Sequence, residues 1–282
     1  MKLFSCSDFE CKDAEFVICG SPFDKNYSYR EGAADAPDAI RDASWEIETY
    51  LIEKDIDACD LNICDIGNLD SATFAGFSDN AGKTVDKFKD KKLIIIGGDH
   101  SITFPFVSEY KKIFKNISVL SLDAHFDLRK EYQDSRDSNA SVMRRVSECI
   151  GCENLFEIGT RAACRDDFLF AKENNINFIP YYEIREKGLD AVDVLLKKIK
   201  GKLYLSIDMD VIDSALAPGV ENPEAEGLSV QEHLELIRRI FRTCDVIACD
   251  VVEVAPKYDN GITSMLAART IYEILGEWAG KK

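Results

Sequence analysis

Eight short runs of apolar, largely β-branched residues recur along the chain, and polar segments with helical spacing separate them. Near-continuous apolar runs are typical of strands covered on both faces, and their alternation with helices implies right-handed crossovers between parallel strands. We therefore predict one three-layer α/β/α domain over residues 1–282, with a mainly parallel sheet of about eight strands. The expected strands are residues 16–19, 61–66, 93–96, 117–122, 155–158, 176–180, 203–207 and 246–252.

The segment 230–241 shows the amphipathic spacing expected of the covering helices. Ser229 stands at its start with Glu232 three residues later, a pairing that predicts a capping box. His233 falls on the polar side of this pattern, so we expect it on the surface. The predicted buried stripe comprises Val230, Leu234, Ile237 and Phe241.

The composition is that of an ordinary soluble globular protein, with 46% hydrophobic and 30% charged residues among 282. No run approaches the roughly 18 consecutive apolar residues that a membrane helix needs, so no membrane association is expected. Residues 1–12 are mixed and polar where a signal peptide would be apolar, which predicts a cytoplasmic protein. The net charge of −16 argues against a nucleic-acid partner and modestly favours cationic substrates.

Ten cysteines are scattered through the chain. Without an export signal a reducing compartment is the expected setting, so most of them should be free thiols. Cys149 and Cys152 form a lone CxxC pair, for which local packing is the favoured interpretation and redox or zinc chemistry the alternative.

Four of the predicted strands end in polar clusters, at the sheet edge where open α/β folds bind ligands. After the strand at 93–96, paired glycines permit a tight turn that aims His100 across this edge. After the strand at 117–122, Asp123, His125 and Asp127 alternate, and in extended backbone they would point to one side. A bound cation would neutralise this grouping, and a solvated acidic strand end is the alternative.

A third cluster repeats the arrangement, with Asp208 and Asp210 following the strand at 203–207. Carboxylates with imidazoles and no cysteine favour manganese or a similar cation over zinc-thiolate chemistry. Six ligands exceed the need of one tetrahedral zinc and suit two divalent cations that share bridging carboxylates about 3.5–4 Å apart. The candidate metal ligands are His100, Asp123, His125, Asp127, Asp208 and Asp210.

The fourth cluster spans residues 250–256 and contains Glu253, which lies outside any ligand spacing. A carboxylate can receive a planar guanidinium through two parallel hydrogen bonds, which fixes its position and orientation. The alternative is a salt bridge from Glu253 to a local Arg or Lys. Together the clusters predict a metal-dependent hydrolase that attacks a guanidinium-like carbon with hydroxide.

These motifs resemble the ureohydrolase family, which includes arginase and agmatinase. The resemblance rests on GGDHS at 97–101, SLDAHFD at 121–127, SIDMDVID at 206–213 with APG at 217–219, and DVVEVAP at 250–256. Upstream, GSPFD at 20–24 with Ser28, Arg30, Gly32, the Ala-Pro pair at 36–37 and the Ile-Arg pair at 40–41 is similar to the agmatinase branch. Leu128 to Glu131 replaces the arginase loop that reads an amino-acid carboxylate, so agmatine ranks above arginine.

The resemblance implies a two-manganese site in a three-layer sandwich that assembles as a homotrimer or homohexamer. Asp123 and Asp208 would bridge the ions, with His100 and Asp127 completing one ligand set and His125 and Asp210 the other. Glu253 would orient a small cationic guanidino substrate, and the expected products from agmatine are putrescine and urea. The candidate catalytic residues are Asp127, Asn139 and Glu253, of which Asn139 and Glu253 are also candidate substrate-binding residues.

Asn139 is the one departure from the agmatinase pattern, which usually has a His that shuttles a proton to the leaving amine. Asn does not titrate near neutral pH, and a lost general acid typically costs about 10²–10⁴-fold in the assisted step. Water or Asp134 would then have to rescue the step. The alternatives are a formimidoylglutamase-like hydrolase, whose relatives often lack this His, or a weakly active metal-binding relative with a structural or regulatory role.

Overall fold

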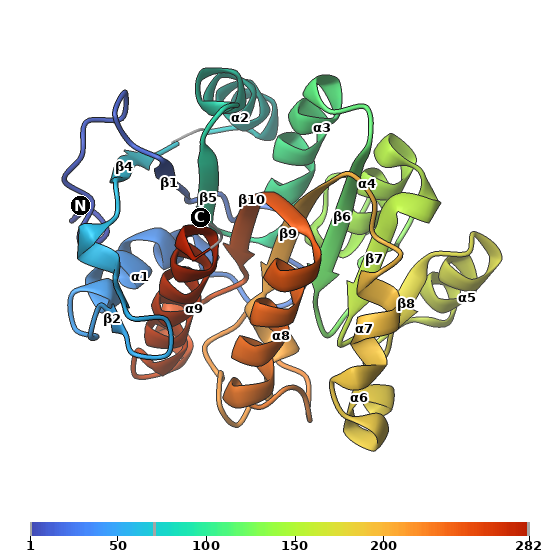
Figure 1. Ribbon diagram of the computed structural model, residues 1–282. Coiled ribbons are helices and arrows are strands. Elements are labelled where there is room, and N and C mark those ends of the chain that lie inside the picture. The colour runs from blue at the N-terminus through green and yellow to red at the C-terminus, as the bar shows by residue number, and fades with distance from the viewer. Residues whose placement is uncertain (1, 70–71, 281–282) are drawn as a thin grey trace.

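A computed structural model describes residues 2–69 and 72–280, arranged around one eight-stranded parallel sheet (Figure 1). The strand order is β4-β1-β5-β10-β9-β6-β7-β8. All eight strands expected from the apolar runs are confirmed, with ends that differ by a few residues. Their bounds are β1 Phe16–Ser21, β4 Ile63–Asn68, β5 Lys92–Gly97, β6 Ile117–Leu122, β7 Leu155–Ile158, β8 Asn177–Ile179, β9 Lys202–Asp208 and β10 Asp245–Val252.

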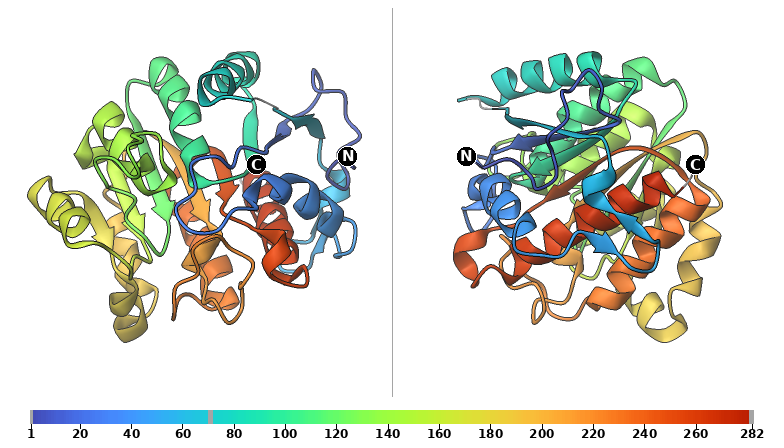
Figure 2. Two further views of the ribbon diagram at one scale, coloured as in Figure 1. Left: turned by 180° about the vertical axis from the view of Figure 1, so that it is seen from behind. Right: turned by 60° about the vertical axis from the view of Figure 1, so that its left-hand side comes forward.

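Helices cover both faces of the sheet, which gives the predicted three layers. The right-hand view of Figure 2 shows α2 above the sheet and α9 below it. The first layer contains α2 (Phe74–Phe88), α3 (Thr103–Ile113), α4 (Val142–Ile150) and α5 (Arg165–Glu173). The second contains α1 (Ala36–Ser44), α6 (Tyr181–Lys187), α7 (Asp190–Leu196), α8 (Val230–Thr243) and α9 (Ile262–Ala279).

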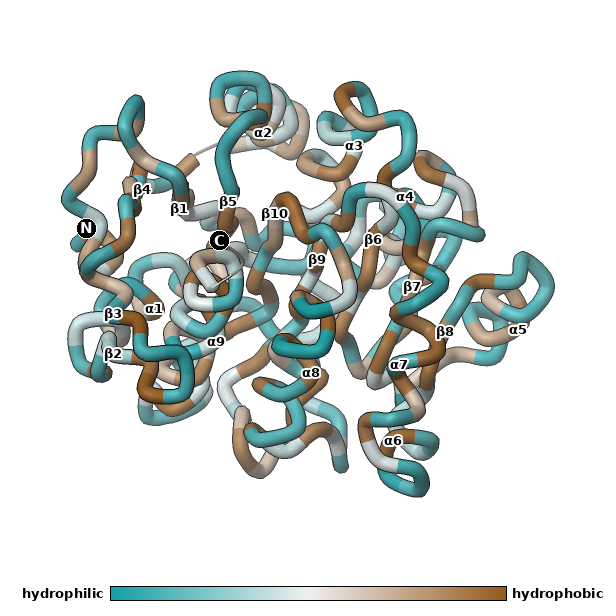
Figure 3. Tube along the Cα trace, in the orientation of Figure 1, coloured by the Kyte–Doolittle hydropathy of each residue, from teal (hydrophilic) through white to brown (hydrophobic). Residues whose placement is uncertain are grey.

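The strands are apolar throughout because each one feeds two cores. In β5, Leu93 and Ile95 pack into one core while Ile94 and Ile96 pack into the other. Each fully buried side chain of this size contributes about 1.5–3 kcal/mol of hydrophobic stabilisation. Figure 3 shows hydrophobic stretches along the central strands, whereas hydrophobic and hydrophilic positions alternate along α8.

Helix α8 begins as predicted, since Ser229 and Glu232 form a capping box. The predicted buried stripe was displaced, however, because Leu234 is only half-buried. His233 is fully buried and its Nε2 lies 3.0 Å from Thr270 Oγ1 on α9, so the expectation of a surface histidine is wrong. The residues that face the sheet and α9 are His233, Leu236, Ile237, Ile240 and Phe241.

The N-terminal segment was not anticipated as an ordered part of the fold. Disulfides join Cys6 to Cys59 and Cys11 to Cys64, and the expectation that most of the ten cysteines are free thiols is confirmed by the other six. Cys149 and Cys152 are among the free cysteines, and both are half-buried and pack against the core.

A two-stranded antiparallel sheet, β2 (Tyr50–Leu51) with β3 (Ile56–Asp57), was also missed. Two-residue strands are too short to produce a recognisable alternation of apolar and polar positions. Among the described helices, none is both long and apolar enough to cross a membrane.

Candidate active site

The four polar clusters follow strands β5, β10, β9 and β6, which are consecutive neighbours in the sheet. Because these strands are parallel, their carboxyl ends share one edge, and the loops that leave them meet there. The topology therefore brings together residues that are far apart in the sequence.

The turn after β5 holds His100 through close backbone packing. A Cβ atom at Gly98 would lie 2.0 Å from the carbonyl oxygen of Phe23, so only glycine permits this approach. Asp99 then caps the short helix His100–Ile102 by accepting a hydrogen bond from the Ser101 backbone N–H. His100 is thereby fixed, fully buried, at the sheet edge.

The aspartates after β6 and β9 converge by turns and not by extended alternation, which corrects the conformation we expected. The His125 backbone N–H donates to Asp123 Oδ1 over 2.6 Å, and Asp127 has a φ of 51°. Asp208 is the N-cap of the short helix Met209–Val211 and accepts from the Asp210 backbone N–H. Because of these turns, the side chains of Asp123 and Asp208 both lie near His100 at the carboxyl edge of the sheet.

One imidazole nitrogen lies among three carboxylates at the centre of the site. His100 Nδ1 is 3.2 Å from Asp123 Oδ2, 3.1 Å from Asp127 Oδ2 and 3.4 Å from Asp208 Oδ2. A single N–H cannot serve three acceptors, and both His100 Nδ1 and Asp123 Oδ2 lack a hydrogen-bond partner of acceptable geometry. A cation among these atoms would satisfy all of them.

A second group of ligand atoms lies beside the first. His125 Nδ1 is 2.8 Å from Asp210 Oδ2 and 3.6 Å from Asp123 Oδ1. Asp123 thus contributes one oxygen to each group, which is the arrangement of a carboxylate shared by two ions. The structure brings all six candidate ligands to this edge, and their oxygen and imidazole donors fit hard or borderline divalent cations.

The close packing of these acidic and imidazole groups shifts their pKa values. Burial raises the pKa of Asp127 to about 6, and the neighbouring Asp123 carboxylate adds to the rise. Burial also opposes ionisation of Asp123, but the close contacts with the His100 and His125 rings and the charges of these rings outweigh it and lower its pKa. For His100 burial lowers the pKa, but Asp123, Asp127 and Asp208 more than reverse the effect. The surroundings of these carboxylates therefore favour positive charge.

A set of buried hydroxyls that sequence reasoning missed orients His100. Its Nε2 lies 2.9 Å from Ser206 Oγ, and that hydroxyl donates to Asp250 Oδ1 over 2.6 Å. Thr103 and Tyr204 donate to the other oxygen of Asp250. These contacts favour the tautomer that keeps Nδ1 available as a ligand, as the outer partners of metal-bound histidines usually do. The signal was present, since Asp250 interrupts an otherwise apolar strand.

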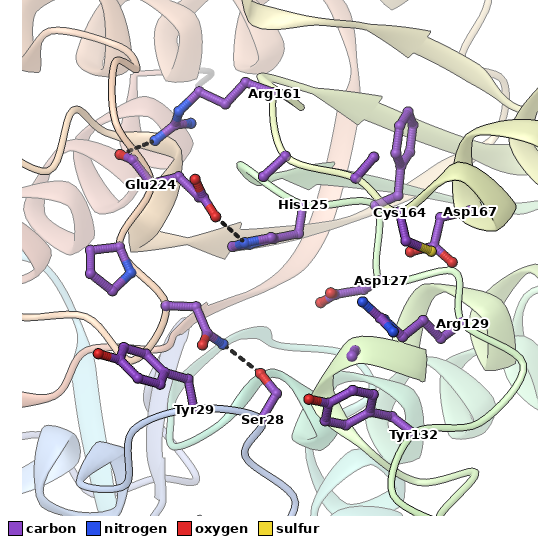
Figure 4. A pocket seen from close by; sticks show the side chains of 16 residues that line it. Ser28, Tyr29, His125, Asp127, Arg129, Tyr132, Arg161, Cys164, Asp167 and Glu224 are labelled. Carbon is purple, nitrogen blue, oxygen red and sulfur yellow. Dashed lines mark hydrogen bonds and ion pairs between the residues drawn. The ribbon is translucent and has the colours of Figure 1, made fainter.

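The cavity beside the site has a volume of about 720 Å³ and reaches His125 and Asp127 (Figure 4). His125 Nε2 lies 3.6 Å from Glu224 Oε1 at its wall. Arg161 also lines the cavity, but its guanidinium donates to backbone carbonyls that include those of Asp210 and Glu224. Arg161 is therefore committed to holding the wall together.

Glu253 lies against the turn that carries His100, with 2% of its surface exposed and a φ of 66°. Its Oε1 accepts from the His100 backbone N–H over 2.6 Å and from Asn139 Nδ2 over 3.3 Å, while its buried Oε2 has no hydrogen-bond partner. Within residues 2–69 and 72–280, no Lys or Arg forms a salt bridge with it, contrary to the alternative interpretation. Burial raises the pKa of Glu253 to about 8, and the Asp99 carboxylate adds to the rise.

Residues 14–276 match the model of the arginase family, and the chain belongs to this family. It is 33% identical to an agmatinase from Pyrococcus horikoshii over 95% of this chain and 93% of that protein. It is 34% identical to an N(1)-aminopropylagmatine ureohydrolase from Thermococcus kodakarensis over 96% of this chain and 93% of that protein. The chain is a hydrolase of the arginase and agmatinase type.

Solved structures agree with this assignment. The agmatine ureohydrolase of Thermoplasma volcanium superposes with a TM-score of 0.92 at 31% identity, covering 99% of this chain and 95% of that one. Formimidoylglutamase from Bacillus subtilis superposes with a TM-score of 0.90 at 26% identity, covering 98% and 92%. The three-layer fold is therefore shared by relatives that act on different substrates.

Proposed function

We propose that this protein hydrolyses a guanidino compound at a centre of two divalent cations, with Mn²⁺ as the metal and agmatine as the substrate. The single observation that carries the proposal is the pair of ligand groups that share Asp123. The similarity to agmatinases supports the choice of substrate.

The six ligands divide by position. His100, Asp127 and the shared Asp123 would hold one cation, and His125, Asp210 and Asp123 the other. Asp208 faces His100 Nδ1, and we propose that it is the second shared carboxylate. When bound, the metals supply a hydroxide nucleophile near neutral pH and stabilise the negative charge that develops on the attacked carbon's substituents.

Glu253 and Asn139 act on the substrate side of this centre. Glu253 Oε2 is buried and without a hydrogen-bond donor, so a guanidinium N–H can donate to it and be held in a fixed orientation. Asn139 donates to the other oxygen and keeps the carboxylate in place, but it carries no titratable proton. The proton for the leaving amine therefore comes from another group.

Asn139 also favours a second candidate, hydrolysis of a formimino compound. The resemblance to formimidoylglutamases includes the absence of a His at this position, and one of them shares the fold. A metal-binding protein with little turnover is the remaining possibility from a different class.

An assay panel separates these functions. Metal-loaded protein is incubated with agmatine, arginine, guanidinobutyrate and formimidoylglutamate, and urea and formamide are measured. We expect urea from agmatine. Formamide without urea would replace the proposal with the formimino reaction, and two bound metals without either product would establish the non-catalytic role.

Glu253→Gln tests the proposed role of the carboxylate. Loss of the charge should raise KM for the guanidino substrate about tenfold or more, because a charged hydrogen bond contributes about 1.5–3 kcal/mol. Glu153→Gln on the exposed surface is the matched control. Unchanged kinetics in Glu253→Gln would remove Glu253 from the substrate site.

A further inference from the structure

A second buried glutamate, Glu221, lies beside Glu253 in a part of the site that the proposed mechanism does not use. Val220 and Val254 form an antiparallel bridge, and the Glu221 backbone N–H donates to the Glu253 carbonyl over 3.2 Å. The two glutamates therefore leave adjacent backbone segments. Glu221 follows the motif at 217–219, and no spacing pattern in the sequence marks it as a site residue.

Both glutamates have one anchored oxygen and one free oxygen. Glu221 is fully buried, and its Oε1 accepts from the Ala33 backbone N–H over 3.0 Å. Its Oε2 is buried without a hydrogen-bond partner, as is Glu253 Oε2. Such an orphaned carboxylate oxygen is costly to bury unless a donor or a cation reaches it.

The surroundings of this pair are acidic. Asp24 and Asp99 are the further carboxylates that act on Glu221, and Asp24 Oδ1 is also buried without a partner. No salt bridge from a Lys or Arg to any of these four carboxylates occurs within the described ranges. Burial, and then the charges of Glu253, Asp24 and Asp99, raise the pKa of Glu221 to about 11. These carboxylates therefore form a buried acidic group that a cation would stabilise.

We propose that Glu221 is a second carboxylate of the guanidinium subsite and binds the substrate cation together with Glu253. A guanidinium group is planar and carries several N–H donors in a fixed fork, so it can satisfy two carboxylates at once. This inference rests on the proposed function and deepens it. It assigns recognition of the cationic head to a pair of glutamates with separate anchors.

Glu221 also has a structural contact that the test must separate from this role. Ala33 belongs to the segment that includes Ser28, whose Oγ accepts from Asn222 Nδ2 at the cavity wall. Glu221 and Asn222 therefore both hold this segment against the site. A purely structural Glu221 would need only an acceptor for the Ala33 N–H.

Glu221→Gln and Glu221→Ala distinguish the two roles. Gln keeps an oxygen for the Ala33 N–H but removes the charge, whereas Ala removes both. The probe is guanidinium chloride at millimolar concentration, titrated into metal-loaded protein by calorimetry, so the readout does not require turnover. Tyr258→Phe is the matched control for disturbance of the 24–33 segment, since the exposed Tyr258 hydroxyl donates to the Glu31 carbonyl, and urea unfolding confirms that each variant is folded.

We expect Glu221→Gln to weaken guanidinium binding about 10-fold to 100-fold, and Glu221→Ala at least as much, while Tyr258→Phe retains binding. With active enzyme, the Gln variant should raise KM for the guanidino substrate more than it lowers kcat. Guanidinium binding equal to wild type in either folded Glu221 variant would overturn the proposal.

Failure of the proposed function is a separate outcome. It would be visible in the wild-type protein, which would release no urea in the substrate panel, with or without formamide. The calorimetric comparison of Glu221→Gln with wild type would still decide whether Glu221 belongs to a guanidinium site.

Discussion

Two fully buried histidines in this molecule have opposite electrostatic surroundings. His100 lies at the carboxyl edge of the sheet among Asp123, Asp127 and Asp208, which raise its pKa well above the usual value although burial lowers it. His233 lies between α8 and α9, where burial lowers its pKa to about 4. Burial alone thus keeps an imidazole neutral, and only a group of carboxylates makes the same burial favourable for positive charge.

The two histidines differ in their polar contacts as well as in their charge surroundings. His233 has one polar contact, to Thr270, and completes the packing of two helices. His100 Nδ1 lies close to carboxylates, including that of Asp123, and its Nε2 contacts the orienting hydroxyl of Ser206. The strand edge therefore concentrates charge that a cation must balance, whereas the helix interface excludes charge altogether.

Removing the shared carboxylate should have the largest effect. Asp123→Asn removes one negative charge from both ligand groups, so we expect activity to fall more than about 100-fold and metal content to drop below two ions per chain. Asp90→Asn on the exposed surface is the matched control. Elemental analysis and urea release measure the two effects, and full metal occupancy with full activity would contradict the shared role.

Removing the orienting hydroxyl of His100 should have a smaller effect. Ser206→Ala leaves the ligands intact but takes away the partner of Nε2, so metal affinity or activity should fall about 10–100-fold. Ser118→Ala is the comparison, since Ser118 is a buried serine that donates to the Lys200 carbonyl near the beginning of β6. Equal behaviour of the two variants would show that Ser206 has no orienting role.

The helix interface should respond to pH through His233. Its folded pKa of about 4 lies below the ordinary 6.5, so the unfolded chain binds the proton more tightly. The associated stability is present above pH 6.5 and is lost as pH falls toward 4, with about 2 kcal/mol lost between pH 7 and pH 5. Urea unfolding of wild type and His233→Gln at both pH values tests this. An identical pH dependence in the two proteins would refute it.

Replacing Asn139 with histidine would place a third buried imidazole beside the Glu253 carboxylate, in surroundings unlike those of His100 or His233. Asn139→His should raise the rate about tenfold, because a titratable donor at this position restores part of the general-acid assistance. The kcat of the variant with agmatine measures the gain. An unchanged or lower rate would mean that another group already supplies the proton or that Asn139 itself reads the substrate.

The sheet was predictable because its strands are buried on both faces and are therefore apolar along their whole length. The capping box at Ser229 was predictable for the same kind of local reason. The buried face of α8 was not predictable in this way. His233 is polar and was therefore expected on the surface, whereas it is buried and contacts Thr270. The disulfide at Cys6 and Cys59 depends on contacts between residues 53 positions apart, which spacing alone does not reveal.

The grouping of the candidate metal ligands was predictable from topology, since parallel strand ends must share an edge. Their local conformation was not, because Asp123 and Asp208 bend the backbone by accepting hydrogen bonds from residues two positions later. The outer partner Ser206 and the buried Glu221 were also missed. Their roles come from contacts across the sheet and between loops, which no local pattern encodes.

The central claim is that the carboxyl edge of this sheet holds two divalent cations. Protein freed of metal, reloaded with Mn²⁺ and dialysed can be analysed for metal per chain, with Asp123→Asn treated in parallel. We expect two ions per wild-type chain and fewer in the variant. One ion or none in the wild-type protein would contradict this claim.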